Sequence, residues 1–265
     1  MDKSLLVRYL GFPATLVHGD STTLDRWLWL RQRLPRTRES ERLIDIGCGS
    51  GAFSIGAALR GYDVLGLSWD ERNQQVARER ALLCGAESAT FDVLDVRRLG
   101  ERLDLRQMFD VAICCETIEH NLDDRQLMRN IAHCLRPGGR VLLTTPYLLY
   151  RPIDAGDMGP WARVEDGGHV RRGYSRAMLR ELASEAGLTV ERFSSCSGVL
   201  SQKLTLAYRM LSRANPMLAW VAVLPLRLAP PLFDRLVSRI LRWPNLSICL
   251  EAYKPRFAPE VTEDA

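Results

Sequence analysis

The sequence predicts an α/β fold built on a doubly wound, mostly parallel sheet of seven strands, the last of them antiparallel. Short apolar runs of strand length alternate with amphipathic stretches of helix length between residues 42 and 193. The run at residues 109–115 is apolar after Asp110, as a strand buried on both faces should be. The first run leads into a turn with three glycines, which is typical of ligand-binding turns in such sheets.

The elements follow one another regularly along the chain. The predicted strands are residues 43–46, 63–67, 89–91, 109–115, 140–145, 188–193 and 246–253. The predicted helices between them are residues 52–60, 71–84, 123–135 and 175–186. Asp70 or Ser68 is the expected N-cap of the helix at residues 71–84. Ligands of a parallel sheet bind at the carboxyl ends of its strands, so the site is expected there.

Further segments flank or interrupt this core. The predicted divisions are an N-terminal helical cap at 1–40, a ligand-binding domain at 41–198, an apolar helical insert at 199–245, a final strand at 246–254 and a disordered tail at 255–265. Within the cap, Leu24, Trp27, Leu28 and Leu34 have helical spacing. We expect this helix to lie over the ligand mouth or to pack on the sheet edge.

The insert combines apolar and basic residues. Apolar side chains between residues 232 and 241 have helical spacing, and Arg235, Arg239 and Arg242 form a basic face. Pro225, together with neighbouring prolines and Arg227, is expected to keep the apolar run below transmembrane length. The insert would therefore cover a hydrophobic substrate tunnel, contact an anionic membrane surface, cap the sheet or form a dimer interface.

Composition narrows the class of protein. With 265 residues and 46% hydrophobic content, the chain can bury one principal core. No basic stripe with interleaved aromatics is present, and a pI of about 8.7 is unremarkable, so no nucleic-acid partner is expected. Seven scattered cysteines without a C-x-x-C pair predict neither disulfides nor a metal site. The first ten residues lack a signal-peptide core, which favours a cytoplasmic location, with membrane association through 199–245 as an open alternative.

The glycine turn indicates the kind of ligand. Its glycines leave main-chain N–H groups free at a helix N-terminus, which suits a nucleotide-like molecule. Asp45 lies two residues before the first glycine, where it would repel a pyrophosphate. A third glycine in G-x-G-x-G spacing suits a ligand without phosphate that lies against the loop.

Asp45, Gly47, Gly49 and Gly51 resemble motif I, D-x-G-x-G-x-G, of the class I S-adenosylmethionine-dependent methyltransferases, whose core is Rossmann-like. Later segments resemble the same family in order. They are Phe91–Leu99, similar to its D-x-x-x-L segment; Phe109-Asp110 with Glu116–His120, similar to strand 4 and its E-x-x-E-H tail; and Leu135–Val141, similar to its L-x-P-G-G turn. The resemblance covers about residues 42–145.

The resemblance implies S-adenosyl-L-methionine as the cofactor. The implied binding residues are Asp45, Gly47, Cys48, Gly49, Gly51, Ser68, Trp69, Asp95, Val96 and Glu116. Asp95 would accept from the adenine amino group, and the Val96 N–H would face a ring nitrogen. The chain departs from the family at Ser68, where the family has an acid for the ribose hydroxyls; Asp70 lies two residues further on.

Three residues are candidates for catalysis: His169, Glu116 and His120. His169 lies in a polar loop of the kind that closes over substrates, whereas His120 has a structural alternative, a bond to the backbone. The predicted function is methyl transfer to a small, hydrophobic or lipid- or glycan-linked acceptor, with oxygen as the favoured accepting atom. One alternative is C-methylation of an isoprenoid or lipid, suggested by Glu119-His120; another is a non-catalytic binding subunit, suggested by Ser68.

Overall fold

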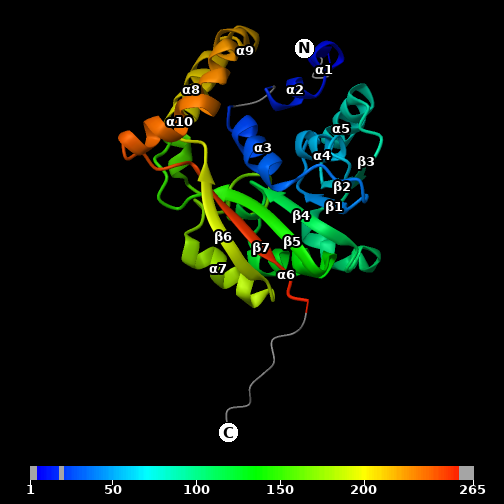
Figure 1. Cartoon of the computed structure of the whole chain (residues 1–265). Coiled ribbons are helices and arrows are strands. Elements are labelled where there is room, and N and C mark those ends of the chain that lie inside the picture. The colour runs from blue at the N-terminus through cyan, green and yellow to red at the C-terminus, as the bar shows by residue number, and fades with distance from the viewer. Residues whose placement is uncertain (1–4, 18–20, 257–265) are drawn as a thin grey trace.

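In the computed structural model, which describes residues 5–17 and 21–256, seven strands form one sheet in the order β3-β2-β1-β4-β5-β7-β6 (Figure 1). The strands are β1 (Arg42–Ile46), β2 (Asp63–Ser68), β3 (Ala89–Val93), β4 (Phe109–Cys115), β5 (Leu135–Pro146), β6 (Thr189–Cys196) and β7 (Ser247–Tyr253). β1 to β5 pair in parallel, and β7 runs antiparallel between β5 and β6. The predicted fold class is confirmed.

Helices cover both faces of the sheet. The α-helices are α1 (Leu5–Leu10), α2 (Phe12–Leu16), α3 (Thr22–Arg33), α4 (Ala52–Ala58), α5 (Glu71–Cys84), α6 (Asp124–Cys134), α7 (Arg176–Glu185), α8 (Val199–Ser212), α9 (Pro216–Val223) and α10 (Ala229–Ile240). Short 3₁₀ helices are η1 (Val96–Glu101), η2 (Leu103–Leu105), η3 (Ile118–His120), η4 (Ala155–Met158) and η5 (Leu224–Leu228).

Alternate side chains of each strand enter different cores. Ile44 and Ile46 of β1 belong to a cluster that includes residues of α6 and α7. Leu43, which precedes Ile44 and points to the other face, belongs to the opposite cluster with residues of α3, α4 and α5. Figure 1 shows these helix groups on opposite faces of the sheet. The central strands β1 and β4 are therefore buried on both sides, which explains their nearly continuous apolar character.

β5 begins earlier than predicted. Phe109 of β4 pairs with Leu135, and after a register shift Val111 pairs with Arg140, so residues 136–139 form a bulge at the start of the strand. The Gly138 amide donates to the Lys254 carbonyl at 2.8 Å, and the Lys254 amide donates to the Gly139 carbonyl at 2.8 Å. Residues 136–139, which were expected to form a turn before β5, therefore lie inside that strand. They are hydrogen-bonded to Lys254, the residue that follows β7.

The insert forms a helical arm at one end of the sheet, drawn in yellow-orange to orange in Figure 1. Trp220 Nε1 and Arg227 Nη1 both donate to the Val17 carbonyl, at 2.7 and 2.6 Å, and tie the arm to the segment after α2. Within the described residues, Pro216–Ile240 is long and apolar enough to cross a membrane by length and composition, and 22% of its most apolar window is buried. The expectation that the prolines keep this run below transmembrane length was wrong. They do interrupt the α-helix with η5, but Pro225 and Pro230 lie in the first turns of η5 and α10, where proline is tolerated.

The predicted tail at 255–265 lies mostly outside the described residues, which end at 256.

Candidate active site

A cleft of about 410 Å³ lies at the carboxyl ends of the strands, where the topology predicts a ligand site. Its lining residues come from the turns after β1, β2, β3 and β4 and from a loop before α7. They are Gly47, Gly49, Ser68, Trp69, Asn73, Asp95, Val96, Arg97, Glu116, Thr117, His120, Asn121, Glu165, Asp166 and Gly167.

The glycines of the turn after β1 have different tasks. A Cβ at Gly49 would meet no atom within 4 Å, so this residue faces open space in the cleft. A Cβ at Gly51 would lie 2.8 Å from the Ala77 Cβ and 2.9 Å from the Phe91 ring. Gly51 therefore permits α5 and β3 to pack against the turn, and a contact between this residue and the ligand stays a prediction.

Asp45 lies beneath this turn and does not line the cleft. Its side chain is 1% exposed, Oδ2 accepts from Ser54 Oγ at 2.7 Å, and Oδ1 has no hydrogen-bond partner. Burial raises the pKa of this carboxyl from 3.8 to about 6. A buried carboxylate oxygen without a partner is a feature that a cationic or hydrogen-bonding ligand would satisfy. Cys48 is also buried, with its Sγ 3.9 Å from Gln74 Oε1, so its side chain does not line the cleft.

Ser68 and Trp69 line the cleft where β2 ends. Asp70 does not, because its Oδ1 accepts from the Arg72 amide at 2.8 Å as the N-cap of α5. The nearest acid to the expected ribose position is thus occupied in capping. Asn73, in the first turn of α5, also lines the cleft and supplies both donor and acceptor atoms. The sequence analysis missed Asn73. In the sequence this residue stands out only by its position in the first turn of the helix that follows β2.

Asp95 lines the cleft together with Val96, but both of its oxygens pair with Arg97. Arg97 also reaches Glu165 Oε2 at 2.6 Å, so the acid expected to contact adenine is linked to the polar loop at residues 165–172. The Asp95 carboxylate has more lone pairs than its bonds to Arg97 use, so it can still accept a hydrogen bond from a ligand. Arg97 and Glu165 were not predicted as site residues, because their contact joins segments 68 positions apart.

Glu116 lies at the end of β4 with a left-handed backbone, φ 50°. Its Oε1 accepts from Thr144 Oγ1 at 3.0 Å and Ser247 Oγ at 3.1 Å, and its Oε2 pairs with Arg26 of α3 at 3.1 Å. Through this ion pair α3 contacts a residue that lines the cleft. Trp29 Nε1 of the same helix donates to Ser194 Oγ of β6 at 2.8 Å. Helix α3 therefore packs on the sheet, as one expectation described, and a position over the ligand mouth stays a prediction.

The two candidate histidines lie against each other, with ring centroids 4.6 Å apart and the planes nearly perpendicular. His120 lines the cleft, and its Nδ1 lies 3.0 Å from the Gly168 carbonyl. His169 is half-buried behind it and does not line the cleft. Burial, followed by the neighbouring His120, lowers the pKa of His169 to about 4, which makes it a weak base at neutral pH. The arrangement thus favours His120 over His169 as the group nearest a substrate.

The structure brings eight of the predicted site residues together around one cleft. They are Gly47, Gly49, Ser68, Trp69, Asp95, Val96, Glu116 and His120. Asp45, Cys48, Gly51 and His169 lie behind this lining. Trp69 is 65% exposed and stands at the rim, where a planar ligand could stack on its ring.

Comparison with known proteins is consistent with this geometry. Residues 22–192 match the model of a family described as a methyltransferase domain. Two curated relatives are named ubiquinone biosynthesis O-methyltransferase. That of Leptothrix cholodnii is 31% identical over 117 residues, which is 44% of this chain and 48% of the relative, and that of Aeromonas salmonicida is 36% identical over 105 residues, 40% of this chain and 43% of the relative. The match therefore spans less than half the length of these relatives.

The fold is also similar to that of a solved protein. A crystal structure of an S-adenosylmethionine-dependent methyltransferase from Mesorhizobium loti has a TM-score of 0.56 and 19% identity, with 90% of this chain and 100% of that chain covered.

Proposed function

The chain belongs to the class I S-adenosylmethionine-dependent methyltransferase family, and on that premise we propose that it transfers a methyl group from S-adenosylmethionine to oxygen of a small, hydrophobic acceptor. The names of the curated relatives support oxygen as the accepting atom. The observation that carries the proposal is the cleft itself, in which the glycine turn, Ser68, Asp95 and Glu116 converge at the strand ends.

The cofactor would lie across these strand ends. The open space at Gly49 would receive its amino-acid portion, Ser68 and Asn73 would bind the ribose hydroxyls, and Asp95 and Val96 would face the adenine. S-adenosylmethionine is cationic at sulfur and at its amino group, so the negative potential of the buried Asp45 and of Glu116 favours its binding.

Methyl transfer is an in-line displacement in which the acceptor oxygen bonds to the methyl carbon and the carbon–sulfur electron pair returns to sulfur. The protein contributes mainly by alignment, which can supply up to ~7 to 11 kcal/mol of the barrier. The hydroxyl proton must leave, and His120 is the imidazole that lines the cleft. A positioned base of this kind adds roughly 10² to 10⁴-fold.

Calorimetric titration with S-adenosylhomocysteine tests the cofactor site. We expect one molecule to bind per chain, and Asp45→Ala to weaken binding because the buried acid is lost. Asp63→Ala is the matched control, since Asp63 is exposed at the start of β2, at the edge of the sheet away from the cleft. Absence of binding to the wild-type chain would contradict the enzyme proposal and favour a non-catalytic binding subunit.

The proposal that the acceptor is lipid-linked rests on the outer face of the insert. In α10 the polar residues Asp234 and Ser238 are buried, whereas Leu232, Leu236 and Ile240 are 73, 60 and 69% exposed. The helix therefore presents its apolar side to solvent, which is the reverse of a helix that caps a sheet. The neighbouring α9 and η5 carry further exposed apolar residues, namely Met217, Leu218, Val221, Leu226 and Leu228. We infer that these side chains together form an interaction surface.

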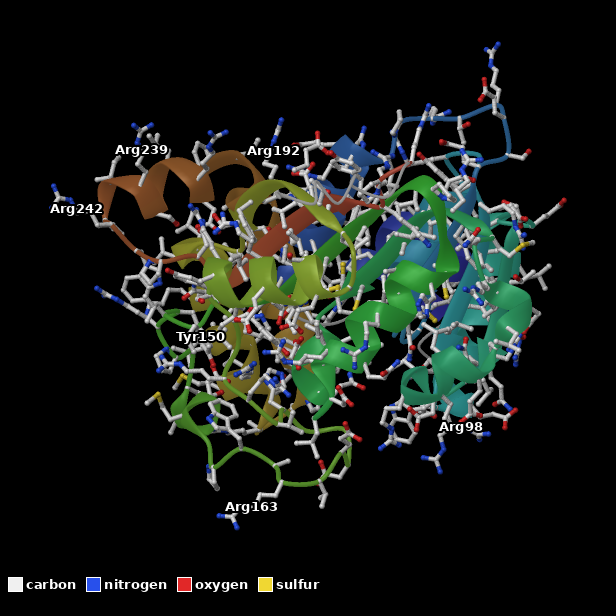
Figure 2. All side chains as sticks on the ribbon, turned by 90° about the horizontal axis from the view of Figure 1, so that it is seen from below. Arg98, Tyr150, Arg163, Arg192, Arg239 and Arg242 are labelled. Atoms are coloured by element: carbon white, nitrogen blue, oxygen red, sulfur yellow. The ribbon has the colours of Figure 1, made fainter. Side chains whose placement is uncertain are left out.

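Arginines border the same face and indicate an anionic surface as its partner. Arg192, Arg235, Arg239 and Arg242 line a second cavity of about 800 Å³ between α3, the end of β6 and α10. Figure 2 shows Arg192, Arg239 and Arg242 projecting outward along one edge of the molecule, whereas Arg98 lies at the far end. Apolar side chains that enter the lipid interface, with cations at the headgroup level, are what an anionic membrane binds.

Flotation with vesicles tests this membrane contact. We expect binding to vesicles that contain phosphatidylglycerol, weaker binding to pure phosphatidylcholine, and loss on Leu232→Gln with Leu236→Gln. Leu103→Gln is the control for the apolar change, since Leu103 is 75% exposed on η2. For charge, Arg239→Gln with Arg242→Gln is compared with Arg98→Gln. Concentration-dependent self-association without vesicle binding would identify the face as a dimer interface instead.

A further inference from the structure

We propose that Cys196 and Cys249 form a thiol pair that a small anionic disulfide of the glutathione class oxidises to a Cys196–Cys249 disulfide bond. In the structure both residues are free thiols, and the Cys249 thiol donates to Cys196 Sγ at a sulfur–sulfur distance of 3.6 Å. The sequence analysis singled out no such pair, because the two residues are 53 positions apart. The contact arises only from the pairing of β6 with β7.

The strand register places the two side chains on one face of the sheet. Cys196 pairs with Ser247, and Cys249 pairs with Ser194, so the two cysteines are diagonal neighbours. Paired residues share a face of the sheet, and so do residues two apart along one strand. A disulfide bond is about 2.05 Å long, so the two sulfurs need to approach by about 1.5 Å. Side-chain rotation can bring them together, because an open cavity lies beside Cys196.

The two thiols differ in their access to solvent. Cys196 is half-buried and lines the cavity of about 800 Å³ between α3, the end of β6 and α10, whereas Cys249 is fully buried. Burial raises the pKa of the Cys249 thiol, which therefore keeps its proton and donates to Cys196. An accessible thiol that reacts first, with a second thiol in contact with it, is the arrangement of a reversible redox pair.

The cavity favours a reagent with negative charge. Its lining includes two acids, of which Asp234 already binds the N-terminus of α8, and five arginines: Arg33, Arg192, Arg235, Arg239 and Arg242. A concave surface with an excess of one charge raises the local concentration of molecules of the opposite charge. Oxidised glutathione is such a molecule, because its carboxylates give it a net negative charge. The cavity volume also lies in the range of ligand pockets, ~300 to 1,000 Å³.

The oxidation consists of two exchange steps. Cys196, as its thiolate, attacks one sulfur of the small disulfide, forms a mixed disulfide and releases one small thiolate. Cys249 then attacks the Cys196 sulfur, the bond between the two cysteines forms, and the second small thiolate leaves. The two released thiolates take up the two protons that the cysteines lose. Two protein thiols are thus oxidised to one disulfide, and one small disulfide is reduced to two thiols.

The bond would close the base of the insert. The chain leaves the sheet after Cys196 and re-enters it at Ser247, so the bond encloses α8, α9, η5 and α10 in one covalent loop. Closing a loop stabilises a protein mainly by limiting the conformations of the unfolded chain. In a reducing compartment such a pair is a dithiol, and its disulfide is transient. The stability of the insert would therefore depend on the supply of oxidised small disulfide.

Oxidation of the full chain by oxidised glutathione tests the pair. The reduced protein is incubated with the reagent, alkylated and digested without reduction for mass spectrometry. We expect a peptide that contains Cys196 linked to one that contains Cys249. In Cys249→Ser, Cys196 should accumulate as its glutathione adduct, and in Cys196→Ser neither product should form. Cys84→Ser is the matched control, because Cys84 is a half-buried thiol on α5, and it should form the link as the wild type does.

Two further measurements test the reagent and the consequence. Arg239→Gln with Arg242→Gln should slow the reaction with oxidised glutathione at least ~3-fold and leave the reaction with neutral hydroxyethyl disulfide unchanged. Arg98→Gln, at an exposed position on η1, is the control and should react as the wild type does. The linked wild type should have a Tm ~4 °C or more above that of the reduced protein.

Each outcome decides one part of the proposal. A stable glutathione adduct on wild-type Cys196 without the link, or no reaction at Cys196, would overturn the pair. Equal rates in the double arginine variant and the wild type would overturn the anionic reagent, and an unchanged Tm in the linked protein would overturn the closure of the insert. Cys196→Ser changes a half-buried residue, so it remains informative where the buried Cys249→Ser does not fold.

Discussion

Asp234 of α10 accepts a hydrogen bond from the Leu200 amide at 2.7 Å and so caps the N-terminus of a different helix, α8. The N-cap residue of α8 is Gly198, which has no side chain to do this. Ser238 Oγ, one turn further along α10, accepts from the Val199 amide at 2.8 Å. The polar stripe of α10 is therefore used inside the insert, and its apolar stripe is left outside.

Asp234→Ala should lower the free energy of unfolding by about 1 to 2 kcal/mol, since it removes a helix cap and leaves buried amides without an acceptor. Urea unfolding at neutral pH measures the change. Arg235→Ala, at the exposed neighbouring position, should stay within ~0.5 kcal/mol of wild type. An equal loss in both variants would argue against the cap.

The contrast between core and insert shows what the sequence can predict. Alternation along β1 and β4 separates the residues of the two cores, because helices cover both faces of these strands and successive side chains point to opposite faces. Helical periodicity in α10 likewise reveals two stripes. It cannot tell which stripe faces the protein, since the partners of Asp234 and Ser238 are backbone amides more than 30 positions away.

The cleft was predictable where its residues follow a strand directly. Gly47, Ser68, Asp95 and Glu116 each lie at or just beyond a strand end, so topology alone gathers them. Asn73 on a helix and Glu165 in a loop reach the cleft through tertiary packing, which no local pattern records.

Gly51→Ala and Gly49→Ala should separate packing from ligand contact. Both residues have positive φ, 79° and 53°, so each variant carries backbone strain of order 1 kcal/mol. Only at Gly51 would the added methyl also collide with Ala77 and Phe91, and we expect the greater loss of stability there. Gly49→Ala should instead weaken S-adenosylhomocysteine binding more than it weakens the fold. Thermal unfolding and calorimetry on both variants check this; the reverse ranking would contradict it.

Ser68→Asp should strengthen binding of S-adenosylhomocysteine, because a charge-assisted hydrogen bond to the ribose is worth ~1.5 to 3 kcal/mol against ~0.5 to 1.5 for a neutral one. Asn73→Ala should weaken binding by the smaller amount. Asp70→Asn serves as the control, since Asp70 caps α5 outside the cleft. If Asp70→Asn alone reduced affinity, the capping acid would be the ribose partner after all.

Asp45 should make the ligand-free protein less stable as pH rises. Its folded-state pKa, raised by burial to about 6, exceeds the unfolded value of 3.8. The unfolded chain then loses the proton first, so the stabilising contribution is complete below pH 3.8 and is lost as pH passes through 6. The shift corresponds to roughly 3 kcal/mol.

Asp45→Asn, whose amide oxygen can still accept from Ser54, should lack this loss of stability. Urea unfolding of both proteins at several pH values measures the difference, with exposed Asp63→Asn as control. S-adenosylhomocysteine should reduce the loss of stability with rising pH in the wild type, because its cationic amine favours the ionised carboxylate. If the difference in stability between wild type and Asp45→Asn did not change with pH, Asp45 would stay ionised in the folded protein.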